Sequence, residues 1–145
     1  MLLTNWFTVI NLVYNNKPIE KYRSHSMEQF KLADGEYKFA NLVWENEPIN
    51  STVLMKLSLE QLGWKKATTY TVLRKLCERG ILINENAIVT SLVKKEQVQK
   101  YESEILLEKS FGNSLPAFLA TFLQDKKLNK SEAEEIQKMI EKASR

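Results

Sequence analysis

Apolar residues recur at helical spacing through residues 33–80, and they form the clearest stripe between Trp64 and Gly80. There, positions i, i+3, i+4 and i+7 are filled by residues that a helix would turn toward a core. These residues are Thr69, Val72, Leu73 and Leu76. Two earlier segments, ADGEYKFANLVWENEP from Ala33 and STVLMKLSLEQLG from Ser51, carry similar apolar faces. The pattern therefore predicts three successive helices.

Capping and breaking residues mark the ends of these helices. Asp34 is suited to cap the first helix, and Pro48 stops it because the residue before a proline is disfavoured in helical backbone. Asn50 or Ser51 is suited to cap the second helix, which ends at Gly63. Its inward-facing residues are expected to be Val53, Leu54, Leu57 and Leu62.

The segment after Gly80 has the composition of two short strands. Ile81–Ile83 and Ala87–Val93 have strand character, and Asn84-Glu85-Asn86 between them suits a tight turn. Three helices followed by a hairpin make a winged helix-turn-helix. The predicted fold is therefore mainly α with a small β-hairpin wing, followed by an α-helical dimerisation region.

The second half of the chain is predicted to be helical again. Lys94–Ser110 is a charged amphipathic segment, and Leu115–Leu123 is almost wholly apolar. Asn129, with Glu132 three residues later, resembles a capping box for a last helix over Lys130–Lys142. A short helix as apolar as LPAFLATFL is either core or a subunit interface. We favour the interface, because the surrounding fragment is too small to bury it.

These elements divide the chain into a winged helix domain at residues 27–93 and a helical dimerisation domain at residues 94–145. Residues 1–26 do not resemble the rest of the chain, and we expect either an extension or an element added to the first domain. No segment reaches the roughly 18 apolar residues that span a bilayer. We therefore expect a cytoplasmic protein with no membrane partner.

Positive charge is concentrated on the third predicted helix. The whole chain carries a net charge of +3, whereas residues 64–79 hold five cations and one carboxylate. The face opposite the apolar stripe offers hydroxyls, a tyrosine ring and cations, which suit base edges and phosphates. This face and its approach contain Lys65, Lys66, Thr68, Tyr70, Thr71, Arg74 and Lys75. The pattern indicates a DNA-binding surface, with an ordinary solvated face as the alternative.

The remaining polar residues give no pattern of a catalytic or metal site. The single cysteine, Cys77, lies beside the apolar stripe and is expected to be a buried structural thiol, with redox or metal sensing as the alternative. The sequence shows no nucleophile paired with a base, no metal-ligand spacing and no phosphate-binding glycine loop. We therefore predict a protein that is not an enzyme and has no metal or cofactor.

Three segments carry a resemblance to a known family. They are LADGEYKFANLVWENEPIN, GWKKATTYTVLRKLCERGIL and FGNSLPAFLATFLQDKKLNKSEAEEIQKMI, in that order between Met27 and Lys142. The second contains a Trp-x-x-x-Thr-x-x-Thr-Val-Leu pattern that starts at Trp64, and the third contains Gly-Asn-Ser-Leu from Gly112. With these motifs the chain resembles the BlaI/MecI penicillinase-repressor family, which includes the CopY-type repressors.

The resemblance implies a homodimeric winged-helix transcriptional repressor that binds a palindromic operator in double-stranded DNA and controls β-lactam-resistance or related stress genes. The third helix would enter the major groove with Ala67, Thr68, Tyr70, Thr71 and Lys75. The dimer contacts would come from Tyr101, Ile105, Leu115, Phe118, Leu119, Phe122, Leu123, Ile136 and Ile140. A winged-helix module that binds protein and an activator with the same DNA contacts are the alternatives.

The chain departs from the family pattern in three places. Its wing is shorter, has no cation and carries Glu85 near the tip, which predicts weak wing contacts with phosphates. It has no C-terminal cysteine cluster like that of the copper-responsive members, which argues against copper sensing. The Asn-Phe bond that a regulatory sensor protease system cleaves in the family corresponds to Thr121-Phe122, where only the Phe is kept.

Overall fold

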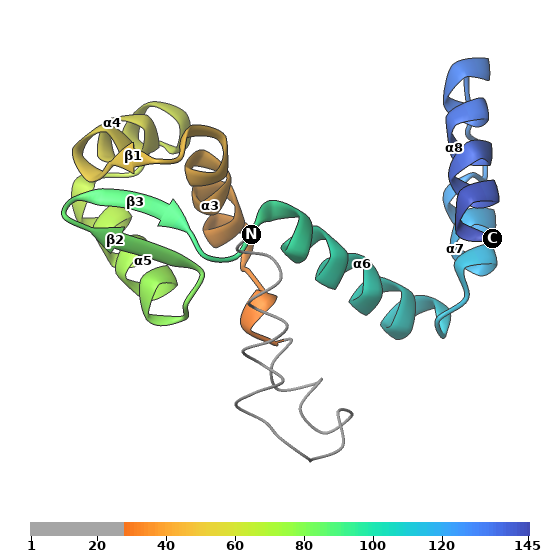
Figure 1. Ribbon diagram of the computed structural model, residues 1–145, viewed down its shortest axis with the longest axis horizontal. Coiled ribbons are helices and arrows are strands. Elements are labelled where there is room, and N and C mark those ends of the chain that lie inside the picture. The colour runs from red at the N-terminus through yellow and green to blue at the C-terminus, as the bar shows by residue number, and fades with distance from the viewer. Residues whose placement is uncertain (1–27) are drawn as a thin grey trace, which may run out of the picture. The chain divides into compact units, whose positions relative to one another are not determined.

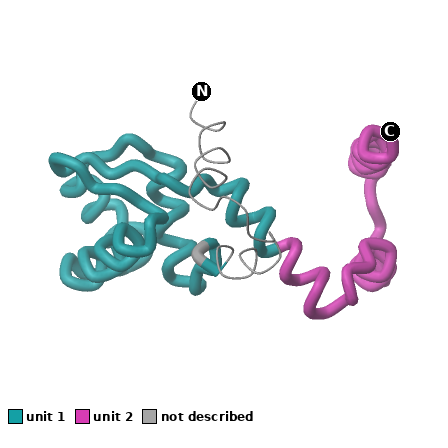
Figure 2. Tube along the Cα trace, turned by 60° about the horizontal axis from the view of Figure 1, so that its bottom comes forward, with its two compact units in different colours: residues 1–102 teal, residues 103–145 magenta. Residues whose placement is uncertain are grey.

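The computed structural model describes residues 28–145, so the predicted extension at residues 1–26 lies outside the described residues. The chain forms two compact units, which divide between Glu102 and Ser103 (Figure 2). This division falls inside helix α6 (Lys95–Phe111) and not after residue 93. The functional domains expected at residues 27–93 and 94–145 therefore stay predictions.

The helices of the first unit follow the pattern of the sequence (Figure 1). They are the short 3-10 helix η1 (Glu28–Phe30) and the α-helices α3 (Asp34–Asn46), α4 (Ser51–Leu62) and α5 (Lys66–Glu78). Asn50 caps α4 by accepting a hydrogen bond from the Thr52 amide at 2.8 Å, and the C-cap Gly63 has a φ of 70°. The cap predicted at Asp34 is wrong, because Ala33 occupies the cap position and Asp34 is the first helical residue.

The described residues contain a three-stranded antiparallel sheet in the order β1-β3-β2. Strands β2 (Leu82–Glu85) and β3 (Ile88–Ser91) form the predicted hairpin, and β1 (Ile49–Asn50) pairs with the other side of β3. The winged helix-turn-helix fold is confirmed. Strand β1 was not predicted, because two residues are too few to show an alternating pattern.

The hairpin turn lies at Asn86 and Ala87, whose φ angles are 51° and 63°. Asn84 and Glu85, which we placed in the turn, are instead paired with β3. Two-residue hairpin loops need positive φ to match the twist of the strands, and alanine gave no signal for this conformation. The Ser51 amide donates to the Ala87 carbonyl at 2.8 Å, so the wing tip is bonded to the start of α4.

Every helix and strand of the first unit contributes to one hydrophobic core. Its fully buried members include Phe39, Ala40, Val43, Leu54, Leu76, Ile81, Val89 and Val98. Val53, which we expected to face inward, is 48% exposed, since it lies one position and about 100° around α4 from Leu54. The start of α6 joins this core, and the Tyr101 ring lies 6.2 Å from that of Phe30.

The second unit contains the rest of α6, helix α7 (Leu115–Phe122) and helix α8 (Lys130–Ala143). Ser114 and Asn129 cap α7 and α8 by accepting hydrogen bonds from amides three residues later, at 3.1 and 2.8 Å. The cap predicted at Asn129 is thus confirmed. No residue from 103 to 145 is buried, so a single copy of this unit has no core of its own.

Replacing Ala87 by glycine is expected to stabilise the first unit by about 0.5–1 kcal/mol, because glycine adopts positive φ without strain. Urea unfolding measures the effect. Ala67→Gly is the control: Ala67 lies in the first turn of helix α5, where the backbone is helical and glycine gives no relief of strain, so this change should lower stability. Destabilisation by both changes would contradict the left-handed conformation at Ala87.

Candidate nucleic-acid interface

Helix α5 turns its apolar stripe inward and its cationic face outward, as the sequence predicts. Thr69, Leu73 and Leu76 are buried, and Val72 is half-buried. The predicted DNA-contacting residues are exposed, except that Tyr70 is half-buried; they are Lys65, Lys66, Ala67, Thr68, Tyr70, Thr71, Arg74 and Lys75. The structure therefore gathers all these side chains on α5 and the residue before it.

Two contacts with neighbouring helices hold the first half of α5 in place. The hydroxyls of Ser58 on α4 and Thr69 on α5, both fully buried, lie 2.9 Å apart. Because Thr69 donates its hydrogen to the Lys65 carbonyl, Ser58 is the donor of this bond. Just before α5, the Trp64 ring stacks on Phe39 of α3 at 6.0 Å. These contacts link the orientation of α5 directly to α3 and α4.

The exposed face offers particular hydrogen-bonding groups. Thr71 donates its hydroxyl hydrogen to the Ala67 carbonyl at 2.9 Å, so toward a partner it presents a methyl group and an accepting oxygen. The Lys66 ammonium lies 5.8 Å from the centre of the Tyr70 ring, within cation–π range. Together with the exposed hydroxyl of Thr68, the face therefore combines hydroxyl groups, an aromatic ring and cations that suit the edges of bases and the phosphates around them.

A buried carboxylate, Glu36, connects the start of α3 to the end of α5. Its two oxygens contact the Lys75 ammonium at 2.6 Å and the Arg79 guanidinium at 2.9 Å, and it also accepts the Ala33 amide at 2.9 Å. Arg79 donates in addition to the Lys31 carbonyl. The Glu36 side chain is only 9% exposed, whereas that of Lys75 is 60% exposed.

These partners keep Glu36 ionised. Burial by itself would raise the pKa of the Glu36 carboxyl, but the hydrogen bonds from Lys75 and Ala33 and the charges of Arg79 and Lys75 hold that pKa below its ordinary value. Glu36 is absent from the site residues predicted from the sequence. Glu36 lies three residues after the N-cap Ala33, the position from which a glutamate accepts the cap amide in a capping box. Nothing in the sequence indicated that Arg79, 43 residues later, would contact this carboxylate.

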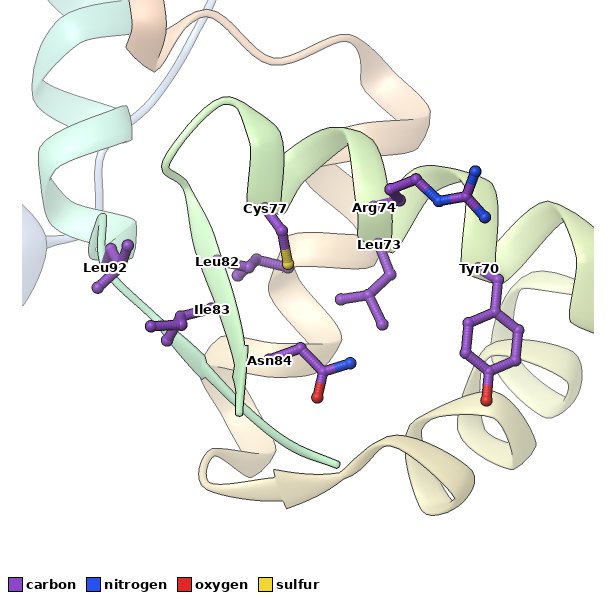
Figure 3. Close-up of a pocket in the computed structure, with 8 residues that line it drawn as sticks. All are labelled: Tyr70, Leu73, Arg74, Cys77, Leu82, Ile83, Asn84 and Leu92. Atoms are coloured by element: carbon purple, nitrogen blue, oxygen red, sulfur yellow. The ribbon is translucent and has the colours of Figure 1, made fainter. Parts of the chain in front are cut away.

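A cavity of about 460 Å³ lies between α5 and the hairpin (Figure 3). Tyr70 and Arg74 line it from α5, and Leu92 lines it from the end of the hairpin. The Cys77 thiol also lies in its wall. It is half-buried, not fully buried as we expected, and burial raises the pKa of this thiol. The cavity is open to solvent, and its lining is mainly apolar.

The predicted dimer contacts lie mostly on the second unit, where they form an apolar surface. Ile105, Leu115, Phe122 and Ile140 are exposed, and Phe118, Leu119, Leu123 and Ile136 are half-buried. The rings of Phe111, Phe118 and Phe122 lie in a row at 5.4 and 5.5 Å. Tyr101 differs from the rest: it is buried in the core of the first unit, so its ring has no surface to offer to another copy.

The Thr121-Phe122 bond lies in the last turn of α7, where both residues are exposed. Among residues 28–145, no group of three or more His, Cys, Asp and Glu side chains is placed to hold a metal ion. Within that same range, none of the helices combines the length and the apolar composition that crossing a membrane requires.

Comparison with known proteins adds to this geometry. A family model described as penicillinase repressor matches residues 32–142, which is most of the chain and extends over parts of both units. A search of curated proteins found no match.

Glu36→Gln is expected to destabilise the first unit by about 1–2 kcal/mol at neutral pH, because the amide leaves Arg79 and Lys75 without a full counter-charge. Urea unfolding of the variant and the wild type measures this difference. Glu45→Gln, at an exposed position of α3, is the matched control and should change stability little.

The same pair of proteins gives a pH test. The pKa of Glu36 is lowered in the folded state, so its contribution is complete above the unfolded value of about 4.3 and is lost as the pH falls through the folded value. The difference in free energy of unfolding between wild type and Glu36→Gln should therefore become smaller in acid. If this difference stayed constant from neutral pH to about pH 3, the ionised Glu36 carboxylate would not be the cause of the lost stability.

Proposed function

The chain belongs to the penicillinase repressor family of DNA-binding transcriptional repressors, and we propose that it binds a palindromic operator as a homodimer and thereby blocks transcription. The observation that carries the proposal is the exposed face of α5, where cations and hydroxyls gather on a helix that is fixed on its other side. In winged helix-turn-helix proteins this helix is the one that enters the major groove.

We assign base contacts to Thr68, Tyr70 and Thr71, with Ala67 allowing close approach at the start of the helix. Thr71 offers an acceptor and a methyl group, which suit the amino group of adenine or cytosine and the methyl group of thymine. The phosphate contacts come from Lys65, Lys66 and Arg74. None of these three cations forms an ion pair with a carboxylate in the part of the chain that the structure describes.

The wing adds little to this binding. Its tip consists of Glu85, Asn86 and Ala87, all exposed, and a carboxylate beside phosphates is unfavourable. The proposal therefore assigns most of the DNA contact to helix α5.

The proposal of a homodimer rests on the second unit. Exposed apolar side chains recur along α6, α7 and α8, for example Leu106, Phe122, Met139 and Ile140 at 45–59% exposure. A unit without buried residues gains hydrophobic stabilisation when a second copy covers this surface. Two copies would then present two α5 helices to the two halves of a palindrome.

The family name suggests the regulated genes, and we propose genes for β-lactam resistance or a related stress response. Cleavage at Thr121-Phe122 is not part of this proposal, because the bond lies in helical backbone and lacks the Asn of the family pattern. A sensor protease as partner stays a prediction from the resemblance.

Arg74→Ala is expected to weaken binding to duplex DNA of any sequence. The plot of log association constant against log salt concentration should become shallower by about 0.9, the contribution of one phosphate contact. Fluorescence anisotropy with a labelled operator duplex, first located by footprinting beside the protein's own gene, gives both quantities. Lys138→Ala on α8 removes the same charge from the second unit and should leave the slope unchanged. Salt-independent binding by the wild type, or none, would favour the protein-interaction alternative.

Ile140→Glu is expected to convert the dimer to monomers, because Ile140 is 53% exposed on α8 and a carboxylate there would be buried in the interface. Sedimentation velocity measures the mass. Gln137→Glu adds the same charge at an exposed polar position of α8 and should leave the dimer intact. A dimer that persists in the Ile140 variant would remove α8 from the interface.

A further inference from the structure

Lys75 differs from the other cations of α5 in what it contacts. It lies on the exposed face, yet its ammonium is held at 2.6 Å by Glu36 from the first turn of α3. The lysines at positions 65 and 66 and Arg74 have no such partner among the carboxylates of residues 28–145. The cations of this face are therefore of two kinds, and the sequence does not distinguish them.

A DNA phosphate would have to compete with Glu36 for Lys75. The Glu36 carboxylate is 9% exposed, so it has given up most of its water and depends on the protein groups that replace it. Arg79 satisfies one of its oxygens, and Lys75 satisfies the other. If Lys75 moved to a phosphate, that second oxygen would lose its charged partner, and the gain at the phosphate would be offset by the loss at Glu36.

We propose that Glu36 is a positioning residue that keeps Lys75 paired inside the protein, so that Lys75 adds no phosphate contact when DNA binds. This inference rests on the proposed DNA-binding function. Glu36 thereby sets the affinity of the α5 face below the value that its cations would otherwise supply. The Glu36 carboxylate on α3 competes with the DNA phosphates for one cation of α5, the Lys75 ammonium.

A purely structural role for Glu36 predicts a different outcome. If the carboxylate only fixed α5 against α3, its loss would loosen the recognition helix and weaken DNA binding without adding a phosphate contact. Release of Lys75 instead makes the dependence of binding on salt steeper, by about 0.9 in the logarithmic slope for one new contact. The direction of the change in slope separates the two roles.

The experiment is a salt titration of full-length protein against one labelled operator duplex. Glu36→Gln should steepen the slope by up to about 0.9, and Lys75→Ala in the wild type should leave it unchanged. The double variant Glu36→Gln/Lys75→Ala should return to the wild-type slope. Glu78→Gln removes a carboxylate from α5 itself and is the control for general loss of negative charge. It should steepen the slope less than Glu36→Gln does.

Three results would overturn the inference: a slope in Glu36→Gln no steeper than in wild type, an equal effect of Glu78→Gln, or a flatter slope in Lys75→Ala. If Glu36→Gln does not fold, as judged by circular dichroism, the comparison of Lys75→Ala with Lys66→Ala still tests whether Lys75 contacts a phosphate. Lys66→Ala should flatten the slope by about 0.9, and Lys75→Ala should not. Failure of the wild type to bind DNA would instead overturn the proposed function, and the inference with it.

Discussion

Helix α5 is attached to the rest of its unit along one side, and this attachment determines what the other side can do. Leu73 and Leu76 are buried in the core, and the hydroxyl of Thr69 bonds to Ser58 of α4 in a site without solvent. A buried polar pair of this kind is specific, since a rotation of α5 would leave the Ser58 hydroxyl without its acceptor in the interior. The rotation of the helix is thus fixed, and Thr68, Thr71 and the neighbouring cations are turned to solvent. Helix α3 also holds α5, through the Phe39–Trp64 stack and the Glu36–Lys75 ion pair.

Much of the first unit could be predicted from the sequence, because its helices follow a 3.6-residue apolar period and end at capping residues. What could not be predicted depends on contacts between distant segments. Strand β1 exists only because Ile49 meets Val89, and its two residues carry no pattern of their own. Val53 was placed in the core because apolar residues crowd α4, although only one side of that helix is covered.

The candidate site shows the same limit. The residue types on the exposed face of α5 could be predicted from charge and periodicity, since a single helix carries them. Which of its cations is paired with a carboxylate could not be predicted, because the pairing of Lys75 depends on Glu36 from another helix. Tyr101 illustrates the converse: an apolar position on an amphipathic helix suggests an interface, but α6 uses that position to complete the core beside Phe30.

The hydrogen bond from the Ser51 amide to the Ala87 carbonyl restrains the tip of the wing. Many hairpins at the edge of a domain move as independent arms, and ordering them on binding lowers the affinity. Here the tip is tied to the first residue of α4, and α4 is tied through Ser58 to α5. The wing and helix α5 are therefore linked through α4 by hydrogen bonds, and a surface held in this way loses less conformational entropy on binding. A partner that binds the exposed face of α5 would therefore meet a surface whose supporting parts are already bonded to one another.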